Sequence, residues 1–174
     1  MAAPELTAIL LVGGAGRRFG SPKALATFDG TTLAERAWRM LGAVARERIA
    51  VGKKADALEL PFPLLDDGTD VRAPLAGLVA GLRAAANDLV VALPVDMPLV
   101  RAEHLRALAT GCTGTAAVPQ TGPLPCALRR AALPVLERRL AAGELTLRDA
   151  FAELEAEISL VGTGAERERV LARP

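Results

Sequence analysis

The residues most suited to chemistry lie near the N-terminus of this 174-residue chain. An apolar run ends in four residues with almost no side chain, 13–16, and the cations Arg17, Arg18 and Lys23 follow. A backbone without bulky side chains can wrap closely around an anion and offer its N–H groups, and the cations add positive charge. The spacing therefore predicts a loop that binds a polyphosphate.

Two familiar phosphate-binding loops do not fit this stretch. A P-loop needs a Gly-Lys pair after four intervening residues, and no such pair follows these glycines. A dinucleotide fingerprint needs G-x-G-x-x-G opening directly into a helix. Here Gly14, Gly16 and Gly20 are spaced more widely, and Pro22 interrupts any helix. We therefore expect a long, cationic loop rather than a tight, neutral one.

A carboxylate stands just beyond a second strand-like run. Residues 88–93 are the most strand-like after the first run, and Asp96 follows in the segment 94–98, which reads PVDMP. Open α/β sheets bind ligands outside the carboxyl ends of their parallel strands. Mg²⁺ commonly takes one or two protein carboxylates and completes its octahedron with water and substrate phosphate. Asp96 is therefore predicted to hold Mg²⁺.

Strand-like and helix-like segments alternate along the chain, which would place these residues at one edge of a sheet. Strands are expected at 6–12, 48–51, 62–65, 88–93, 115–118 and 123–128, and helices at 32–45, 74–86, 103–110 and 131–142. Such alternation favours a mixed, mostly parallel sheet with helices on both faces. We predict a Rossmann-like, three-layer α/β/α fold in which residues 1–174 form a single domain.

Composition and charge argue against several classes of protein. A net charge of +1 creates no large field for nucleic acid or an acidic membrane surface, and few aromatic side chains are available to stack bases. No apolar run approaches the length of a membrane span, and the N-terminus lacks the basic start of a signal peptide, so we expect a cytoplasmic protein. Cys112 and Cys126 are expected to be reduced and structural, and His104 to lie on the surface of a helix.

The segment from Leu11 to Lys23, LVGGAGRRFGSPK, resembles the signature of the molybdenum cofactor guanylyltransferases, the MobA-like family. That signature usually reads L-x-G-G-x-S-x-R-M-G-x-D-K, so Pro22 replaces an acid. Residues 94–98 resemble the C-D-M-P motif of the family, with Val95 in place of Cys. Residues 73–77 resemble its G-P-L-A-G segment, which an Asp precedes at the position of Asp67.

The second half of the chain resembles the family less closely. Residues 122–129 are similar to a Q-P-L-C-A-L-Y stretch, and residues 143–149 to a G-E-R-x-L-R-D segment on the side that receives the pterin. The closing F-x-N-I-N-T-P-E-D-L segment of the family has no counterpart here.

The resemblance implies a nucleotidyltransferase that uses Mg²⁺ to transfer GMP from GTP to the phosphate of molybdopterin or the molybdenum cofactor, with release of pyrophosphate. It implies that Arg18, Lys23 and Asp96 are catalytic and that Asp96 binds the metal. The nucleotide-binding set would comprise Leu11, Val12, Gly13, Gly14, Ala15, Gly16, Arg18, Lys23, Asp67 and Asp96. Proteins that handle the cofactor are expected partners, nucleic acid and membranes are not, and a monomer is favoured.

Several alternatives stay open at this point. Asp66 could serve in place of Asp67. CTP could replace GTP, although the cytidylyl branch tends to carry Ala-Ala-Gly where this chain has residues 12–14. The acceptor could be another phosphorylated molecule, such as a sugar phosphate. Because Pro22 replaces the signature acid, a non-catalytic GTP-binding module is the alternative outside the enzymes.

Overall fold

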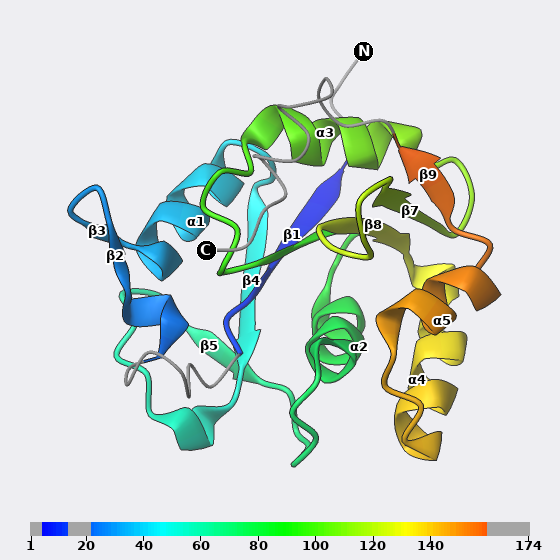
Figure 1. Ribbon diagram of the computed structural model, residues 1–174, viewed down its shortest axis with the longest axis horizontal. Coiled ribbons are helices and arrows are strands. Elements are labelled where there is room, and N and C mark those ends of the chain that lie inside the picture. The colour runs from blue at the N-terminus through cyan, green and yellow to red at the C-terminus, as the bar shows by residue number, and fades with distance from the viewer. Residues whose placement is uncertain (1–4, 14–21, 160–174) are drawn as a thin grey trace.

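A seven-stranded sheet forms the centre of the computed structural model, which describes residues 5–13 and 22–159. In spatial order its strands are β5 (Leu64–Asp66), β4 (Glu47–Gly52), β1 (Leu6–Leu11), β6 (Leu89–Pro94), β8 (Cys126–Arg129), β7 (Ala116–Pro119) and β9 (Glu157–Ser159). β5, β4, β1 and β6 are parallel, whereas β8 runs antiparallel to both of its neighbours. The predicted mixed, mostly parallel sheet is confirmed (Figure 1).

Helices connect the strands and cover the sheet in the described part of the chain. They are α1 (Leu33–Gly42), α2 (Pro74–Ala84), α3 (Ala102–Gly111), α4 (Leu133–Ala142) and α5 (Leu147–Glu153). Smaller elements are the hairpin of β2 (Thr27–Phe28) and β3 (Thr31–Thr32) and the 3-10 turns η1 (Lys23–Leu25), η2 (Lys54–Asp56) and η3 (Arg130–Ala132). Within the described residues, no helix is long and apolar enough to cross a membrane.

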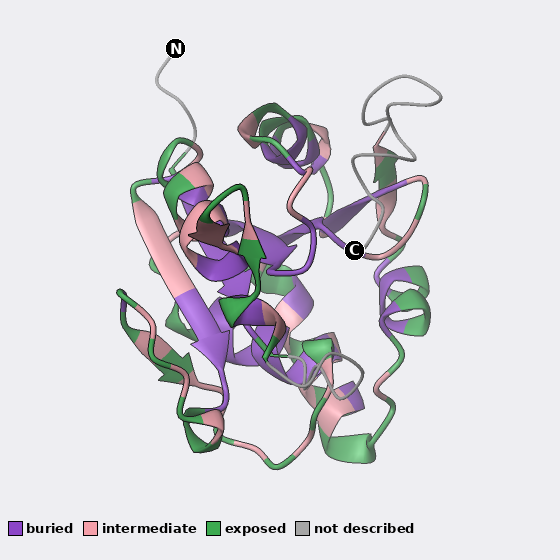
Figure 2. Cartoon of the chain, turned by 60° about the vertical axis from the view of Figure 1, so that its left-hand side comes forward, coloured by how far each residue is buried: buried purple, intermediate pink, exposed green. Residues whose placement is uncertain are grey.

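The side chains of β1 show why helices cover both faces. Ala8 and Leu10 belong to one buried cluster, which α1 and α3 complete, while Ile9 and Leu11 belong to a second, completed by α2, α4 and α5. A strand buried on both faces reads as a continuous apolar run, as β1 does. Figure 1 shows these two sets of helices on opposite sides of the sheet, and Figure 2 shows its central strands buried. The predicted three-layer α/β/α architecture is confirmed.

Two predicted strands are misplaced. The strand expected at 62–65 is β5, which begins at Leu64, because Phe62 turns into the core and stacks on Trp38 with ring centroids 4.3 Å apart. The strand expected at 123–128 is β8 and begins only at Cys126. The prolines of the preceding segment have no N–H to donate to a sheet ladder, which explains the late start.

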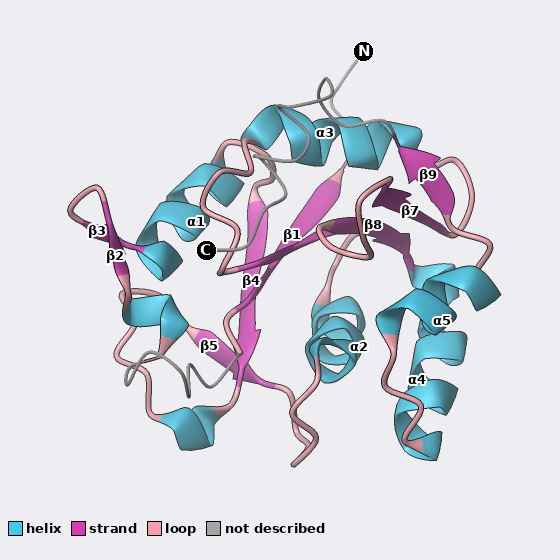
Figure 3. Ribbon diagram, viewed as in Figure 1, coloured by secondary structure: helices cyan, strands magenta, loops and turns pink. Residues whose placement is uncertain are grey.

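Two helix predictions also need correction. The helix expected to reach Ala45 ends at Gly42. The helix α5 was not predicted, because its seven residues are too few to show a full apolar repeat. Figure 3 shows this short helix beside α4. Its residues Leu147, Ala150 and Phe151 pack in the apolar cluster that contains Ile9 and Leu11.

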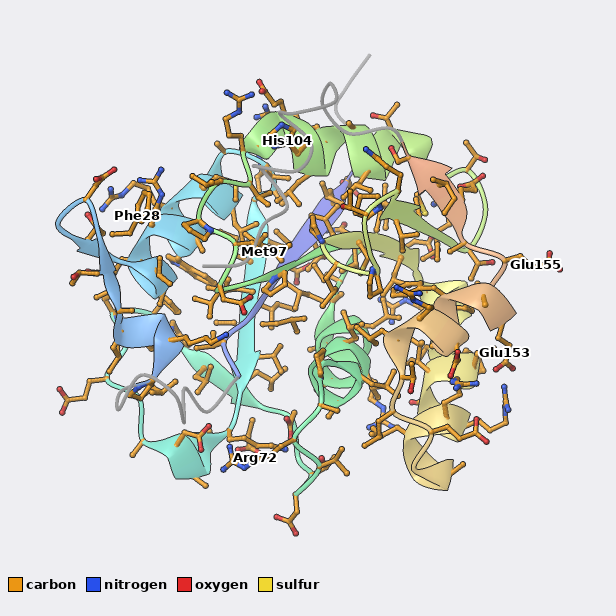
Figure 4. All side chains as sticks on the ribbon, viewed as in Figure 1. Phe28, Arg72, Met97, His104, Glu153 and Glu155 are labelled. Carbon is orange, nitrogen blue, oxygen red and sulfur yellow. The ribbon has the colours of Figure 1, made fainter. Side chains whose placement is uncertain are left out.

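His104 is buried, so the prediction that it lies on the surface is wrong. Its Nδ1 accepts a hydrogen bond of 3.0 Å from the Arg101 N–H, at the start of α3 (Figure 4). The first N–H groups of a helix have no partner inside it, and here a ring nitrogen supplies an acceptor at the N-terminus. His104 therefore has a structural role in beginning α3.

Helix α1 begins with a reciprocal cap between Thr32 and Glu35. The Glu35 N–H donates to Thr32 Oγ1 (3.2 Å), and the Thr32 N–H donates to Glu35 Oε2 (3.2 Å). The Thr32 hydroxyl also donates to this carboxylate, and these bonds lower the pKa of Glu35. This is a capping box, the arrangement that the T-x-x-E spacing of residues 32–35 favours at a helix start.

We expect Thr32→Ala to lower the free energy of unfolding by about 1 kcal/mol at neutral pH, measured by urea denaturation, because an N-cap acceptor is lost. Because the pKa of Glu35 is lower in the folded than in the unfolded protein, its ionised carboxylate stabilises the fold at neutral pH. This contribution to stability is lost as pH falls through the folded pKa. The difference from wild type should therefore shrink in acid. Thr32→Ser keeps the acceptor and should resemble wild type. Equal stability of Thr32→Ala and wild type would contradict this assignment.

Both cysteines are free and buried, as predicted. Burial raises the pKa of the Cys112 thiol to about 11 and also raises the pKa of the Cys126 thiol. Because the thiolate is the reactive form, we expect neither thiol to react with Ellman's reagent at pH 8 until the protein unfolds. Rapid release of two equivalents of chromophore by the native protein would show that the thiols are accessible.

Candidate active site

The carboxyl ends of the four parallel strands meet at one edge of the sheet. Backbone hydrogen bonds of 2.9 to 3.0 Å tie the residues at these ends together, from Val12 to Val51, from Val95 to Leu11 and from Asp67 to Gly52. Asp67 and Asp96, which follow β5 and β6, are therefore fixed at the same edge as the start of the glycine loop.

A cavity of about 420 Å³ opens at this edge. Five of the predicted site residues line it, namely Leu11, Gly13, Lys23, Asp67 and Asp96. Other parts of its wall come from the end of β4, from the segment that enters α2 and from Leu124, which lies in the predicted 122–129 segment. The structure thus brings together residues up to 113 positions apart, counted from Leu11 to Leu124 (124 minus 11).

The remaining predicted residues fall into two groups. Val12 is buried, and its side chain packs in the cluster that α1 and α3 complete, so it does not line the cavity. Gly14, Ala15, Gly16 and Arg18 lie outside the described residues. Their predicted contacts with a nucleotide stay predictions.

Lys23 and Asp96 form an ion pair inside the cavity. Lys23 Nζ lies 3.0 Å from Asp96 Oδ2, and the side chains are 32% and 11% exposed. Lys23 begins η1 directly after Pro22, and Asp96 lies in the turn after β6. The ammonium group is therefore accessible from the cavity, while the carboxylate forms part of its wall.

A second ion pair joins Lys53 to Asp67, and the sequence prediction missed Lys53. Lys53 Nζ lies 2.6 Å from Asp67 Oδ1, and the two side chains are 10% and 6% exposed. Lys53 follows β4 at the same sheet edge as Gly13 and Asp96. A cation directly after a predicted parallel strand was the signal that could have identified it.

The sequence left open whether Asp66 or Asp67 belongs to the site, and the structure favours Asp67, which lines the cavity. Asp66 accepts hydrogen bonds from the Lys54 and Gly68 N–H groups at 2.7 and 2.8 Å, which lower the pKa of its carboxyl. It lines a neighbouring hollow of about 380 Å³ rather than the cavity with Lys23 and Asp96. Asp66 therefore holds its loop, while Asp67 faces the cavity that Asp96 also lines.

Two glycines let α2 lie close against β1. A Cβ at Gly77 would lie 2.8 Å from Leu11 Cδ2, and a Cβ at Gly81 would lie 2.6 Å from Ile9 Cδ1. Carbon atoms pack at about 3.5 to 4.0 Å, so a larger residue at either position would displace a side chain of β1. This approach brings Gly77 into the wall of the cavity.

The donor chemistry at Asp96 suits Mg²⁺. A largely buried carboxylate in an open cavity can supply one oxygen, while water and substrate phosphates supply the others. The described residues contain no group of three or more His, Cys, Asp or Glu that could hold a metal, so an all-protein cage is not formed by them.

Buried Arg139 anchors the segment 143–149, which follows α4 and includes the first residues of α5. Its Nη1 lies 3.0 Å from Glu153 Oε2 and 3.2 Å from Glu144 Oε2, so one guanidinium of α4 contacts both the start of this segment and the last residue of α5. In Figure 4, Glu153 extends from α5 toward α4. The segment that resembles the pterin side of the family is thus tied to α4 through the contact of Glu144 with Arg139.

Comparison with solved structures identifies the fold. Molybdopterin-guanine dinucleotide biosynthesis protein A from Archaeoglobus fulgidus superimposes with a TM-score of 0.74 at 24% identity, covering 94% of this chain and 85% of that chain. A 2-C-methyl-D-erythritol 4-phosphate cytidylyltransferase from Thermus thermophilus superimposes with a TM-score of 0.67 at 20% identity, covering 96% and 93%. At these identities the likeness shows the fold, which is that of the nucleotidyltransferases.

Comparison of sequences defines the family. The MobA-like NTP transferase domain matches residues 8–158, and the chain belongs to this family of nucleotidyltransferase enzymes. A molybdenum cofactor guanylyltransferase from Pseudomonas putida is 35% identical over 160 residues, covering 86% of this chain and 84% of the relative. A relative from Deinococcus radiodurans is 34% identical over 179 aligned positions, covering 97% and 90%. The family predicted from the loop and Asp96 is confirmed.

Proposed function

We propose that this enzyme transfers GMP from GTP to the terminal phosphate of molybdopterin or the molybdenum cofactor, with Mg²⁺, and releases pyrophosphate. The relatives named molybdenum cofactor guanylyltransferase support this assignment. The observation that supports it most directly is the Lys23–Asp96 pair, a cation and a carboxylate 3.0 Å apart in one cavity.

The chemistry requires positioning and charge neutralisation more than proton transfer. The acceptor phosphate is already ionised at neutral pH and attacks the α-phosphate of GTP, so no general base is needed. Lys23 donates to the β- and γ-phosphates and stabilises the charge on leaving pyrophosphate, and we assign Arg18 the same role from the resemblance. Asp96 would hold Mg²⁺, which supplies further neutralisation of the phosphates.

The rest of the cavity accommodates the nucleoside and the acceptor. Leu11, Gly13 and the loop that follows bind the nucleotide, and Asp67 accepts hydrogen bonds from it. Leu124 marks the side where the acceptor enters, since the segments 122–129 and 143–149 resemble the pterin side of the family. We further propose a cytoplasmic monomer that exchanges the cofactor with other proteins.

The direct test is to incubate the protein with GTP, Mg²⁺ and molybdopterin and to follow the guanine dinucleotide by chromatography. We expect stoichiometric formation of dinucleotide and pyrophosphate. Magnesium-dependent GTP binding without product would instead support the non-catalytic binding module.

A second candidate is a nucleotidyltransferase that uses CTP or a different phosphorylated acceptor. The shared fold with the Thermus cytidylyltransferase favours it, because that fold serves another base and a non-pterin acceptor. Calorimetric titration with GTP, CTP and ATP in the presence of Mg²⁺ decides between bases. We expect a preference for GTP, and preferential binding of CTP would overturn the guanylyl assignment.

A further inference from the structure

Lys53 is fully engaged by one loop of the protein. Its ammonium group donates to Asp67 Oδ1 at 2.6 Å, to the Thr69 carbonyl oxygen and, at 3.4 Å, to Thr69 Oγ1. An ammonium group has three protons, and these acceptors can take all of them. Lys53 is therefore not free to bind a phosphate, although it lines the cavity.

The ion pair between Lys53 and Asp67 leaves one carboxylate oxygen of Asp67, Oδ2, available. Oδ1 accepts from Lys53 and from the Thr69 N–H at 3.1 Å, whereas Oδ2 has no hydrogen-bond partner among the described residues. Because Lys53 balances its charge, Asp67 presents an oriented acceptor without a net negative charge. Without Lys53, the carboxylate would be a largely buried and unpaired anion, which is strongly unfavourable.

The two ion pairs lie on opposite sides of β1. Lys23–Asp96 is beside β6, and Lys53–Asp67 is at the ends of β4 and β5. Neighbouring strands are about 4.8 Å apart, so β5 lies about 10 Å from β1, where the glycine loop begins. A triphosphate held by the loop, Lys23 and Asp96 would therefore place its nucleoside over the ends of β4 and β5.

We propose that Lys53 is a positioning residue for the nucleoside. It holds Asp67 neutralised and oriented, so that Oδ2 accepts a hydrogen bond from an uncharged donor, a base N–H or a ribose hydroxyl. This inference rests on the proposed function and concerns the nucleoside end of its substrate. It separates the cavity into a half for phosphates, where the Lys23 ammonium group is accessible, and a half for the nucleoside, where the Lys53 ammonium group is fully engaged.

The test compares binding of GTP with binding of inorganic tripolyphosphate, both with Mg²⁺, by calorimetry. Lys53→Met should weaken GTP binding by about 10- to 100-fold, the effect of losing a well-placed hydrogen bond to a charged group. Tripolyphosphate binding should be unchanged, because it lacks a nucleoside. Lys54→Met removes the same charge at the neighbouring exposed position and should alter neither affinity. Lys53→Arg should recover part of the GTP affinity.

Two results would overturn this inference. One is wild-type GTP affinity in Lys53→Met, and the other is an equal loss of GTP and tripolyphosphate binding, which would indicate a general structural role. If Lys53→Met does not fold, Lys53→Met combined with Asp67→Asn removes both buried charges and provides the same comparison. Absence of GTP binding by the wild-type protein would instead count against the proposed function itself.

Discussion

Lys23→Met and Asp96→Asn are each expected to lower the rate of pyrophosphate release from GTP and molybdopterin by about 100- to 1000-fold, the usual loss when one preorganised charge partner is removed. Lys23 supplies positive charge to the leaving pyrophosphate, and Asp96 the carboxylate that would hold Mg²⁺. Their atoms are 3.0 Å apart, so each also controls the charge and position of the other.

The combined variant should therefore lose less than the product of the two single losses, since residues in contact are not additive. Arg83→Met is the matched control. It breaks the exposed ion pair between Arg83 on α2 and Glu137 on α4, whose side chains are 58% and 36% exposed. That variant should retain wild-type activity. Near wild-type pyrophosphate release by either site variant would contradict the assigned roles.

The parts of this site that could be predicted are those that depend on a short, continuous stretch of sequence. The run in β1 ends in glycines, and Asp96 follows a second apolar strand, so both could be placed at the carboxyl edge of a parallel sheet. Parallel strands that are buried on both faces are continuous apolar runs, which are easily recognised in a sequence. Those two segments carried the prediction of the family, and the alternation of strands and helices along the chain carried the prediction of the fold.

The place of Lys53 after a predicted strand could have marked it as a candidate, but its role could not be assigned in the same way, because that role depends on pairing between distant segments. It meets Asp67 only because β5 pairs with β4 in a register that places Asp66 beside Gly52. The strand β5 has three residues, and its predicted start was two residues too early. A short edge strand carries little periodic signal, so neither its register nor the Lys53 contact could be predicted.

The glycines of α2 provide the last prediction, which concerns stability. Alanine is a better helix former than glycine by about 1 kcal/mol, so substitution at an unobstructed site should stabilise. At Gly81 the added Cβ would meet three carbons of fully buried Ile9, at 2.6, 3.0 and 3.1 Å. We therefore expect Gly81→Ala to lower the free energy of unfolding by about 1 to 3 kcal/mol, as overpacked cores do.

Gly77→Ala should behave differently, because the added Cβ meets only the flexible end of Leu11 at short range. Leu11 can rotate toward the cavity that it lines, so we expect stability near wild type but weaker GTP binding. Urea denaturation and calorimetry separate these effects. Ile9→Val removes the carbon nearest to the new Cβ and should restore part of the stability of Gly81→Ala. If Gly81→Ala alone were more stable than wild type, helix propensity would outweigh packing, and the close approach of α2 to β1 would not limit this position.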